Sequence, residues 1–348
     1  MHENSQLKLS HFDHFPDLLL DVPATSIWQH LDSPSLFHLA GRREESLFVS
    51  VLLHGNEHSG WRAAQEIIRR HRDIPLPRSL LLFVGNIEAA KSNVRTLAHQ
   101  NDYNRVWLGT PCSRAPEVAL MRKVFDIVKR HRPFASIDIH NNAGNNPHYA
   151  CVTSLAHRFL HLARLFGRTV VYFTKPKGVQ TGALSRICPS VTVECGRSQD
   201  IAGDEHVVEF ISSALGLSQW PIHPVPETDV DLMRTYAIMK IPQSAELSFD
   251  GSEADLRFRT DIDRLNFSEL AAGTLFGHLG ERNDQRIRLL PGGDFDEVDE
   301  YFDYSGGEIR LARSAIPAML TRDPDAVRLD SFGYLMHRID RDGRRLAT

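Results

Sequence analysis

The chain has 348 residues, of which 42% are hydrophobic and 24% are charged, and its formal net charge is −4. This composition is typical of a folded globular protein and excludes collagen-like, low-complexity and wholly disordered chains. Because the net charge lacks the basic excess that binding to a phosphate backbone requires, we expect no nucleic-acid partner.

The first part of the chain alternates predicted strands with predicted helices. Residues 46–53 form a nearly continuous apolar run, which is typical of a strand buried on both faces. Residues 61–72 place alanine and isoleucine on one side and basic residues on the other, which indicates an amphipathic helix. Residues 86–105 contain few apolar residues at the spacing of a strand or of a helix, and they are predicted to form a long functional loop. Further strands are predicted over 79–85, 134–139, 169–173 and 190–195, and further helices over 116–132, 155–166 and 203–215.

The pattern changes at a proline-rich stretch, residues 221–228, which we interpret as a domain boundary. Beyond it, turn residues separate short β-like runs. These runs cover 236–241, 245–249, 256–259, 274–278, 287–290, 307–311 and 326–329. The predicted fold class is therefore α/β, with a mixed, mainly parallel sheet flanked by helices in domain 1–220 and a smaller C-terminal β domain over 221–348.

Two motifs at predicted strand ends carry metal-binding side chains. His54 and Glu57 lie in a tight turn after one strand, and His140 ends another. Because open α/β sheets place their ligands at the carboxyl ends of the strands, these three side chains could reach one divalent ion. Three protein ligands leave a position open for water, as in catalytic zinc sites. Asp138 shares a strand face with His140 and could orient its ring. Taken alone, the first motif also fits a solvated loop, and His140 also fits a strand-terminal histidine that forms a hydrogen bond with its own loop.

Glu194 lies near the end of a predicted strand and has Val193 and Cys195 as neighbours. A carboxylate in apolar surroundings has a raised pKa, which suits a general base that takes a proton from metal-bound water and returns it to a leaving amine. The alternative is a solvent-exposed glutamate on an edge strand, and the apolar neighbours favour burial.

Arginine and asparagine recur in the predicted loop, as NVR at 93–95 and DYNR at 102–105. A guanidinium group binds a planar carboxylate bidentately, and beside a metal it can also polarise a scissile carbonyl. The loop therefore indicates recognition of an acidic substrate, although any single arginine could form a surface ion pair instead.

The ordered motifs HGNE, NVR, DYNR, DIH and VTVECG resemble those of the zinc carboxypeptidase superfamily, in particular its succinylglutamate desuccinylase/aspartoacylase branch. The resemblance runs over about residues 46–196, and any one motif is common whereas the ordered set is specific. It implies a zinc carboxypeptidase-like catalytic domain over 1–220 joined to a smaller β domain.

The resemblance also assigns roles to individual residues. It implies a site for one zinc ion with the ligands His54, Glu57 and His140. It implies that Glu194 is the general base and that Arg95 lies beside the carbonyl oxygen. The predicted substrate-binding residues are Asn104, Arg105, Asn141 and Arg186, of which Asn104 and Arg105 would hold a substrate carboxylate.

A rival zinc motif overlaps the first one. HGNEH at 54–58 also matches H-x-x-E-H, in which His54 and His58 would bind the metal and Glu57 would be the base. That motif needs all five residues on one helix. Here it follows a strand, and Ser59 and Gly60 intervene before the predicted helix, so we favour the first ligand set.

The function that follows is hydrolysis of the amide bond of a small N-acyl amino acid by metal-activated water. Two alternatives are a metallocarboxypeptidase that acts on short peptides and a catalytically silent zinc-binding regulatory protein. A β domain over the mouth of the site would exclude long chains, which favours a small amide substrate that bears a carboxylate. The sequence does not define the oligomeric state.

The four cysteines form no CxxC pair, the N-terminus lacks a signal-peptide pattern, and no run reaches the ~18 apolar residues that a membrane span needs. We therefore expect a cytoplasmic protein without a membrane partner.

Overall fold

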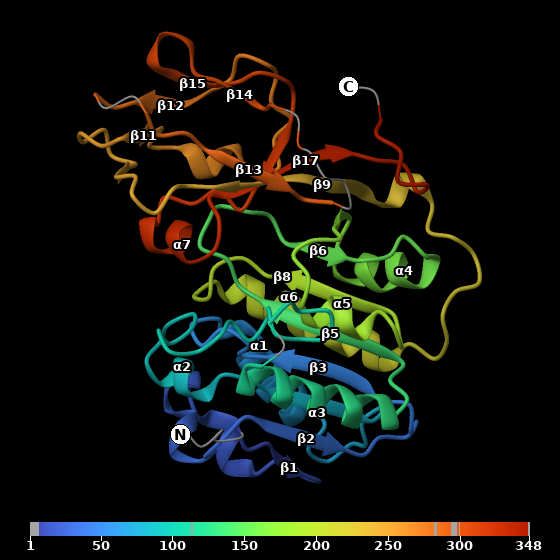
Figure 1. The fold of residues 1–348 in the computed structure, drawn as a ribbon. Coiled ribbons are helices and arrows are strands. Elements are labelled where there is room, and N and C mark those ends of the chain that lie inside the picture. The colour runs from blue at the N-terminus through green and yellow to red at the C-terminus, as the bar shows by residue number, and fades with distance from the viewer. Residues whose placement is uncertain (1–6, 113, 282–283, 294–297, 299, 347–348) are drawn as a thin grey trace. The chain divides into compact units, whose positions relative to one another are not determined.

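The computed structural model describes residues 7–112, 114–281, 284–293, 298 and 300–346 (Figure 1). The chain divides into two compact units. Unit 1 consists of Met1–Asn141, His148–Val170 and Pro176–Asp231, and unit 2 consists of Asn142–Pro147, Val171–Lys175 and Leu232–Thr348. Two short segments of the N-terminal part thus belong to unit 2.

Unit 1 contains a mixed sheet with the strand order β1-β2-β4-β3-β5-β8-β6. The four central strands β4, β3, β5 and β8 are mutually parallel, whereas β2 and β6 run antiparallel to their inner neighbours. The strands are β1 (Ser10–Phe12), β2 (Ser35–Leu39), β3 (Leu47–Val51), β4 (Leu80–Val84), β5 (Ala135–His140), β6 (Tyr149–Val152) and β8 (Ser190–Glu194). Strand β7 (Thr169–Tyr172) lies where the chain passes from unit 1 into unit 2.

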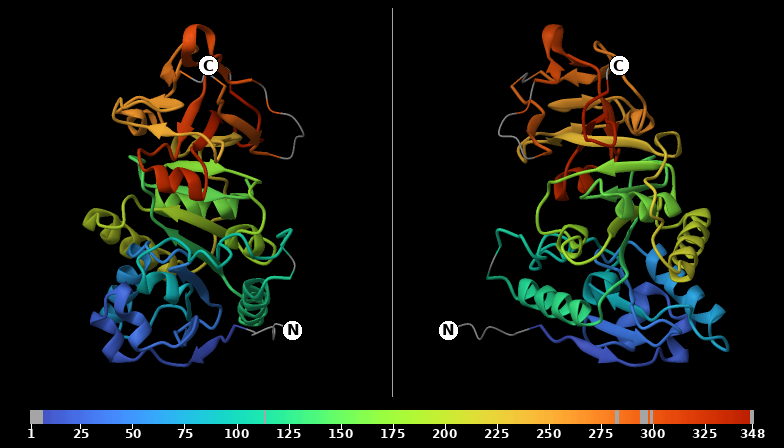
Figure 2. Two further views of the ribbon diagram at one scale, coloured as in Figure 1. Left: turned by 60° about the vertical axis from the view of Figure 1, so that its left-hand side comes forward. Right: turned by 90° about the vertical axis from the view of Figure 1, so that its right-hand side faces the viewer.

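Helices cover both faces of this sheet because the central strands are apolar on both faces, and every residue of β3 and β4 is buried. On one face, α3 and α5 pack with Phe48 and Phe83, and Figure 2 shows α3 (green) beside the blue N-terminal strands. On the other face, α1 lies against β3 and β5, and α6 packs on α1. The helices of unit 1 are α1 (Ser59–Arg70), α2 (Ile87–Lys91), α3 (Pro116–Arg130), α4 (His157–Phe166), α5 (Gln180–Leu184) and α6 (Ile201–Gly216), with 3₁₀ turns at Asp17–Asp21, Ala24–Gln29 and Glu227–Asp229. In the described part of the chain, no helix combines the length and the apolar character that crossing a bilayer requires.

Unit 2 is mostly β structure. Its five-stranded sheet has the order β10-β11-β12-β15-β14, and β9 pairs antiparallel with both β13 and β17, of which β17 also pairs with β16. Phe258, Phe276 and Phe332 lie in its apolar core. The elements are β9 (Asp231–Lys240), β10 (Leu247–Ser248), β11 (Leu256–Phe258), β12 (Leu275–Leu279), β13 (Arg288–Pro291), β14 (Phe302–Asp303), β15 (Glu308–Leu311), β16 (Ile316–Ala318), α7 (Pro324–Leu329) and β17 (Gly333–Arg338), with 3₁₀ turns at Ile262–Leu265 and Ser305–Gly307. The predicted fold class, a mainly parallel α/β sheet with helices and a further β part, is confirmed.

Two local predictions are wrong. The run 326–329, predicted as a strand, belongs to α7, because Pro324 occupies the first helical position and the Asp323 carboxylate accepts hydrogen bonds from two N–H groups of the first turn. The predicted loop 86–105 begins with α2, whose first turn is capped by Asn86. In both places a capping side chain decided the local structure.

Candidate metal and active site

Neighbouring strands bring His54 and His140 together. Strand β3 ends shortly before His54, and His140 is the last residue of β5, its parallel neighbour. A Cβ atom on Gly55 would lie 2.2 Å from backbone atoms of Ala89 and Ala90, so only glycine lets α2 approach this turn so closely. The motifs at the two strand ends therefore meet at the carboxyl edge of the sheet, as the sequence predicts.

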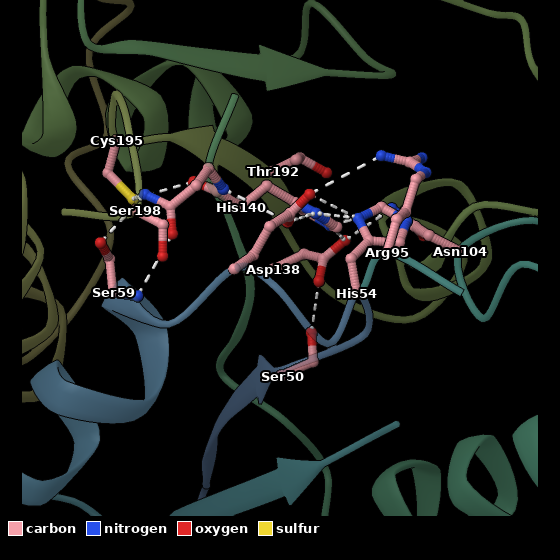
Figure 3. A network of polar contacts seen from close by, with 12 residues as sticks. Ser50, His54, Ser59, Arg95, Asn104, Asp138, His140, Thr192, Cys195 and Ser198 are labelled. Carbon is pink, nitrogen blue, oxygen red and sulfur yellow. Dashed lines mark hydrogen bonds and ion pairs between the residues drawn. The ribbon is translucent and has the colours of Figure 1, made fainter. Parts of the chain in front are cut away.

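Three donor groups converge at this edge. The Nδ1 atom of His54 lies 2.8 Å from Oε1 of Glu57, and Nδ1 of His140 lies 2.6 Å from Oε2 of the same carboxylate. The donor atoms of the three side chains all lie within 4.8 Å of one another, and all three residues are buried. Figure 3 shows the two imidazoles within the polar network. This arrangement fits a metal site made of two imidazole nitrogens and one carboxylate.

Two further carboxylates hold the outer edges of these imidazoles. Asp138 Oδ2 lies 2.8 Å from Nε2 of His140, and Asp102 Oδ1 lies 3.0 Å from Nε2 of His54. Ser50 donates its hydroxyl to the other oxygen of Asp138 at 2.7 Å. Because both Nε2 atoms face carboxylates, both Nδ1 atoms are left to face the site. The sequence analysis missed the role of Asp102, although its place in the DYNR motif was a usable signal.

The charges at the site shift its pKa values strongly. Burial acts to raise the pKa of Glu57, but His54 and His140 outweigh it and hold that pKa well below its usual range. Burial acts to lower the pKa of His140, but Asp138 and Glu57 raise it well above its usual value. Metal binding at this cluster would therefore displace a proton.

Glu194 lies beside this cluster. It ends β8, and its Cα atom is paired with that of His140 on β5 and with that of Tyr149 on β6. Glu194 is half-buried. Burial raises the pKa values of the Cys151 and Cys195 thiols, and the nearby negative charge of Glu194 raises them further. The structure thus places the predicted general base next to the predicted metal ligand His140.

The predicted polar loop folds over the same edge. Arg95 donates from Nη2 to Asp102 at 3.0 Å, and its Nη1 lies 3.7 Å from Oε1 of Glu57. Asn104 donates from Nδ2 to Asp138 at 3.1 Å, and its side-chain oxygen accepts the backbone N–H of Gln180 at 2.8 Å. The loop thus brings one guanidinium group and one amide to the cluster of His54, Glu57 and His140.

Of the other predicted site residues, Arg105 and Asn141 interact with this group of residues, whereas in the part of the chain that the structure describes Arg186 does not. Arg105 follows Asn104 and contributes to the low pKa of Asp102. Asn141 follows His140 and donates its backbone N–H to Glu57 at 3.2 Å. Arg186 lies against Gly109, and among the described residues its side chain makes no hydrogen bond to the cluster.

The rival ligand set does not form. His58 directs Nε2 to the carbonyl oxygen of Gly55 at 3.1 Å, and α1 begins only at Ser59. The described donor atoms that converge belong to His54, Glu57 and His140. The H-x-x-E-H interpretation fails because its five residues do not lie on a helix.

One family model and several solved structures are similar to this chain. The family model described as "Succinylglutamate desuccinylase/Aspartoacylase catalytic domain" matches residues 44–209. No curated protein matches the chain. Among solved structures, the chain is similar to succinylglutamate desuccinylase from Chromobacterium violaceum, with 17% identity, a TM-score of 0.55 and coverage of 86% of each chain.

Two further solved structures show the same fold. Murine aminoacylase 3 has 15% identity and a TM-score of 0.56, and the alignment covers 86% of this chain and 97% of that one. A product-bound ectoine utilization protein from Ruegeria pomeroyi has 12% identity, a TM-score of 0.55 and coverage of 88% of each chain.

Proposed function

We propose that the protein is a zinc-dependent hydrolase of small N-acyl amino acids, because residues 44–209 match the model of the succinylglutamate desuccinylase/aspartoacylase catalytic domain. The observation that carries this proposal is the convergence of His54, Glu57 and His140 beside Glu194. We also propose that it acts in the cytoplasm, because all four cysteines are free thiols.

The donor set suits zinc. Two imidazole nitrogens and one carboxylate are ligands of catalytic zinc sites, which keep a further position open. The carboxylates of Asp102 and Asp138 on the two Nε2 atoms are the outer support that such ligands have. Bound there, zinc would lower the pKa of water and polarise the amide carbonyl.

Glu194 moves the proton in the proposed mechanism. Its carboxylate accepts a proton from the attacking water, whose oxygen forms a bond to the amide carbon. When the carbon–nitrogen bond breaks, the protonated Glu194 returns that proton to the departing nitrogen. The products are the free carboxylic acid and the free amino acid.

Arginine and asparagine side chains orient the substrate. Arg95, which lies near Glu57, faces the oxygen on which negative charge develops. Arg105 and Asn104 hold the substrate carboxylate. Within the protein, Asn104 donates one amide hydrogen to Asp138, and its Nδ2 also lies 3.0 Å from Nε2 of His140. Arg186 is the proposed contact for a substrate side chain.

The proposal is tested with the purified protein, its zinc content and a substrate panel. We expect one zinc ion per chain and hydrolysis of at least one N-acetyl or N-succinyl amino acid. Glu194→Gln should keep zinc while turnover falls roughly 10²- to 10⁴-fold. His58→Ala should keep both zinc and turnover. Cleavage of short peptides alone would indicate a carboxypeptidase, and bound zinc without any hydrolysis would indicate a regulatory protein.

A further inference from the structure

Asn141 has a side chain whose hydrogen-bonding groups are used within the protein. Its Nδ2 donates to the hydroxyl of Ser59 at 2.9 Å and to the carbonyl oxygen of Gly196 at 3.0 Å. Its Oδ1 accepts the backbone N–H of Ser59 at 3.2 Å. The residue is 6% exposed. A side-chain amide has two N–H donors, so Asn141 has none left for a substrate.

These bonds join the chain segments that carry the chemistry. Ser59 follows the turn that holds His54 and Glu57, and Gly196 lies two residues after Glu194. Gly196 has a φ of 77°, so the chain turns sharply directly after the strand that ends in Glu194. The carbonyl of this turn is the group that Asn141 holds.

The main chain around Asn141 strengthens the same connection. The backbone N–H of Asn141 donates to Oε2 of Glu57 at 3.2 Å, and the backbone N–H of Cys195 donates to the carbonyl oxygen of His140 at 3.0 Å. Asn141 therefore contacts a metal-ligand carboxylate with its main chain and the turn after the general base with its side chain.

We infer that Asn141 is a positioning residue that fixes Glu194 relative to the metal ligands, rather than a residue that contacts the substrate. This inference rests on the proposed function, in which Glu194 is the base. It replaces the substrate-binding role that the sequence resemblance implies for Asn141.

A second set of hydrogen bonds, which does not involve Asn141, also joins the segment after Glu194 to α1. Arg62 on α1 binds Asp204 on α6 through two nitrogens and also donates to the carbonyl oxygen of Ser198. The hydroxyl of Ser198 accepts the backbone N–H of His58 at 3.0 Å. Figure 3 shows Ser59, Cys195 and Ser198 at the end of the polar network away from Arg95 and Asn104. Two connections thus link the turn after Glu194 to the start of α1. One runs through Asn141, which also contacts Glu57, and the other runs through Ser198.

The test compares Asn141→Ala with the milder Ser59→Ala, which removes the hydroxyl acceptor and leaves the Ser59 N–H in place. Asn145→Ala is the matched control, because Asn145 is exposed and lies four residues farther along the chain. The measurements are the zinc dissociation constant by chelator competition, kcat and KM at saturating zinc, and the inhibition constant of the product amino acid. Circular dichroism checks that each variant folds.

For Asn141→Ala we expect zinc affinity to fall about 10- to 100-fold, as for other outer supports of metal ligands. We expect kcat to fall about 10²-fold through misplacement of Glu194, whereas KM and the product inhibition constant stay at the wild-type values. Ser59→Ala should shift zinc affinity and kcat in the same direction by less, and it decides the question if Asn141→Ala fails to fold. Asn145→Ala should match the wild type.

A raised KM and product inhibition constant with unchanged zinc affinity would show a substrate contact and overturn the inference. Reduced zinc affinity with unchanged kcat at saturating zinc would overturn the connection to Glu194. If the wild-type protein hydrolyses no N-acyl amino acid, the proposed function fails, and zinc affinity alone then decides whether Asn141 positions the metal ligands.

Discussion

The fully buried carboxylate of Asp138 lies 2.8 Å from Nε2 of His140, two residues farther along the same strand. It also accepts hydrogen bonds from Ser50 and Asn104, so its position is held from three sides. This relationship selects the tautomer of His140 that directs Nδ1 toward Glu57 and the metal position.

Replacing this carboxylate should weaken metal binding. Asp138→Asn keeps the shape but can present an amide N–H to Nε2 of His140, which favours the tautomer that protonates Nδ1. We expect the zinc dissociation constant to rise about 10- to 100-fold in a chelator competition assay. Asp126→Asn on the exposed side of α3 is the control. Equal zinc affinity in both variants would contradict the role of Asp138.

Arg105 should affect substrate binding more than metal binding. The proposed bond from its guanidinium to the substrate carboxylate is charge-assisted and worth about 1.5–3 kcal/mol, so Arg105→Ala should lower kcat/KM roughly 10- to 150-fold, mainly through KM. Steady-state kinetics and zinc content are the measurements, and Arg158→Ala on the exposed side of α4 is the control. An unchanged KM would exclude Arg105 from the carboxylate contact.

Gly55 should be intolerant of any side chain. In Gly55→Ala the new Cβ would lie 2.2 Å from the backbone of α2, which must move, and we expect a loss of about 1–3 kcal/mol or more in unfolding free energy. Gly216→Ala is the matched control, because a Cβ there meets no atom within 4 Å. Urea unfolding measures both, and equal midpoints would refute the close approach of α2.

His131 should make the folded state sensitive to acid. Burial lowers the pKa of His131 below 6.5, and His38, His11 and Arg130 lower it further. The unfolded chain therefore binds a proton at a higher pH than the folded one, so this contribution to stability is present above pH 6.5 and is lost as the pH falls through 6.5 toward the lower folded pKa.

His131→Asn should reduce the loss of unfolding free energy between about pH 8 and pH 5, measured by urea unfolding. His30→Asn, at an exposed position, is the control. A variant that keeps the full acid sensitivity of the wild type would assign that sensitivity to other groups.

The central strands of unit 1 were predictable because a short apolar run buried on both faces has few alternative structures. The predicted strand 79–85 is observed as β4 (Leu80–Val84), and 134–139 as β5 (Ala135–His140). Strand β6 was not predicted, because it is short and becomes a strand only by pairing with β8. The run 326–329 is too short to separate a strand from a helix by periodicity.

The order of the motifs along the chain was enough to predict that His54, Glu57 and His140 converge, because the two histidines follow strands whose carboxyl ends must meet in a parallel sheet. The sequence alone could not predict that Asp102 supports His54 or that Asn141 binds the turn at Gly196. These pairs are separated by dozens of residues, and only the folded chain decides which loop returns to which strand end. The tertiary structure alone shows that the side-chain amide of Asn141 forms its hydrogen bonds with Ser59 and Gly196 of the protein itself.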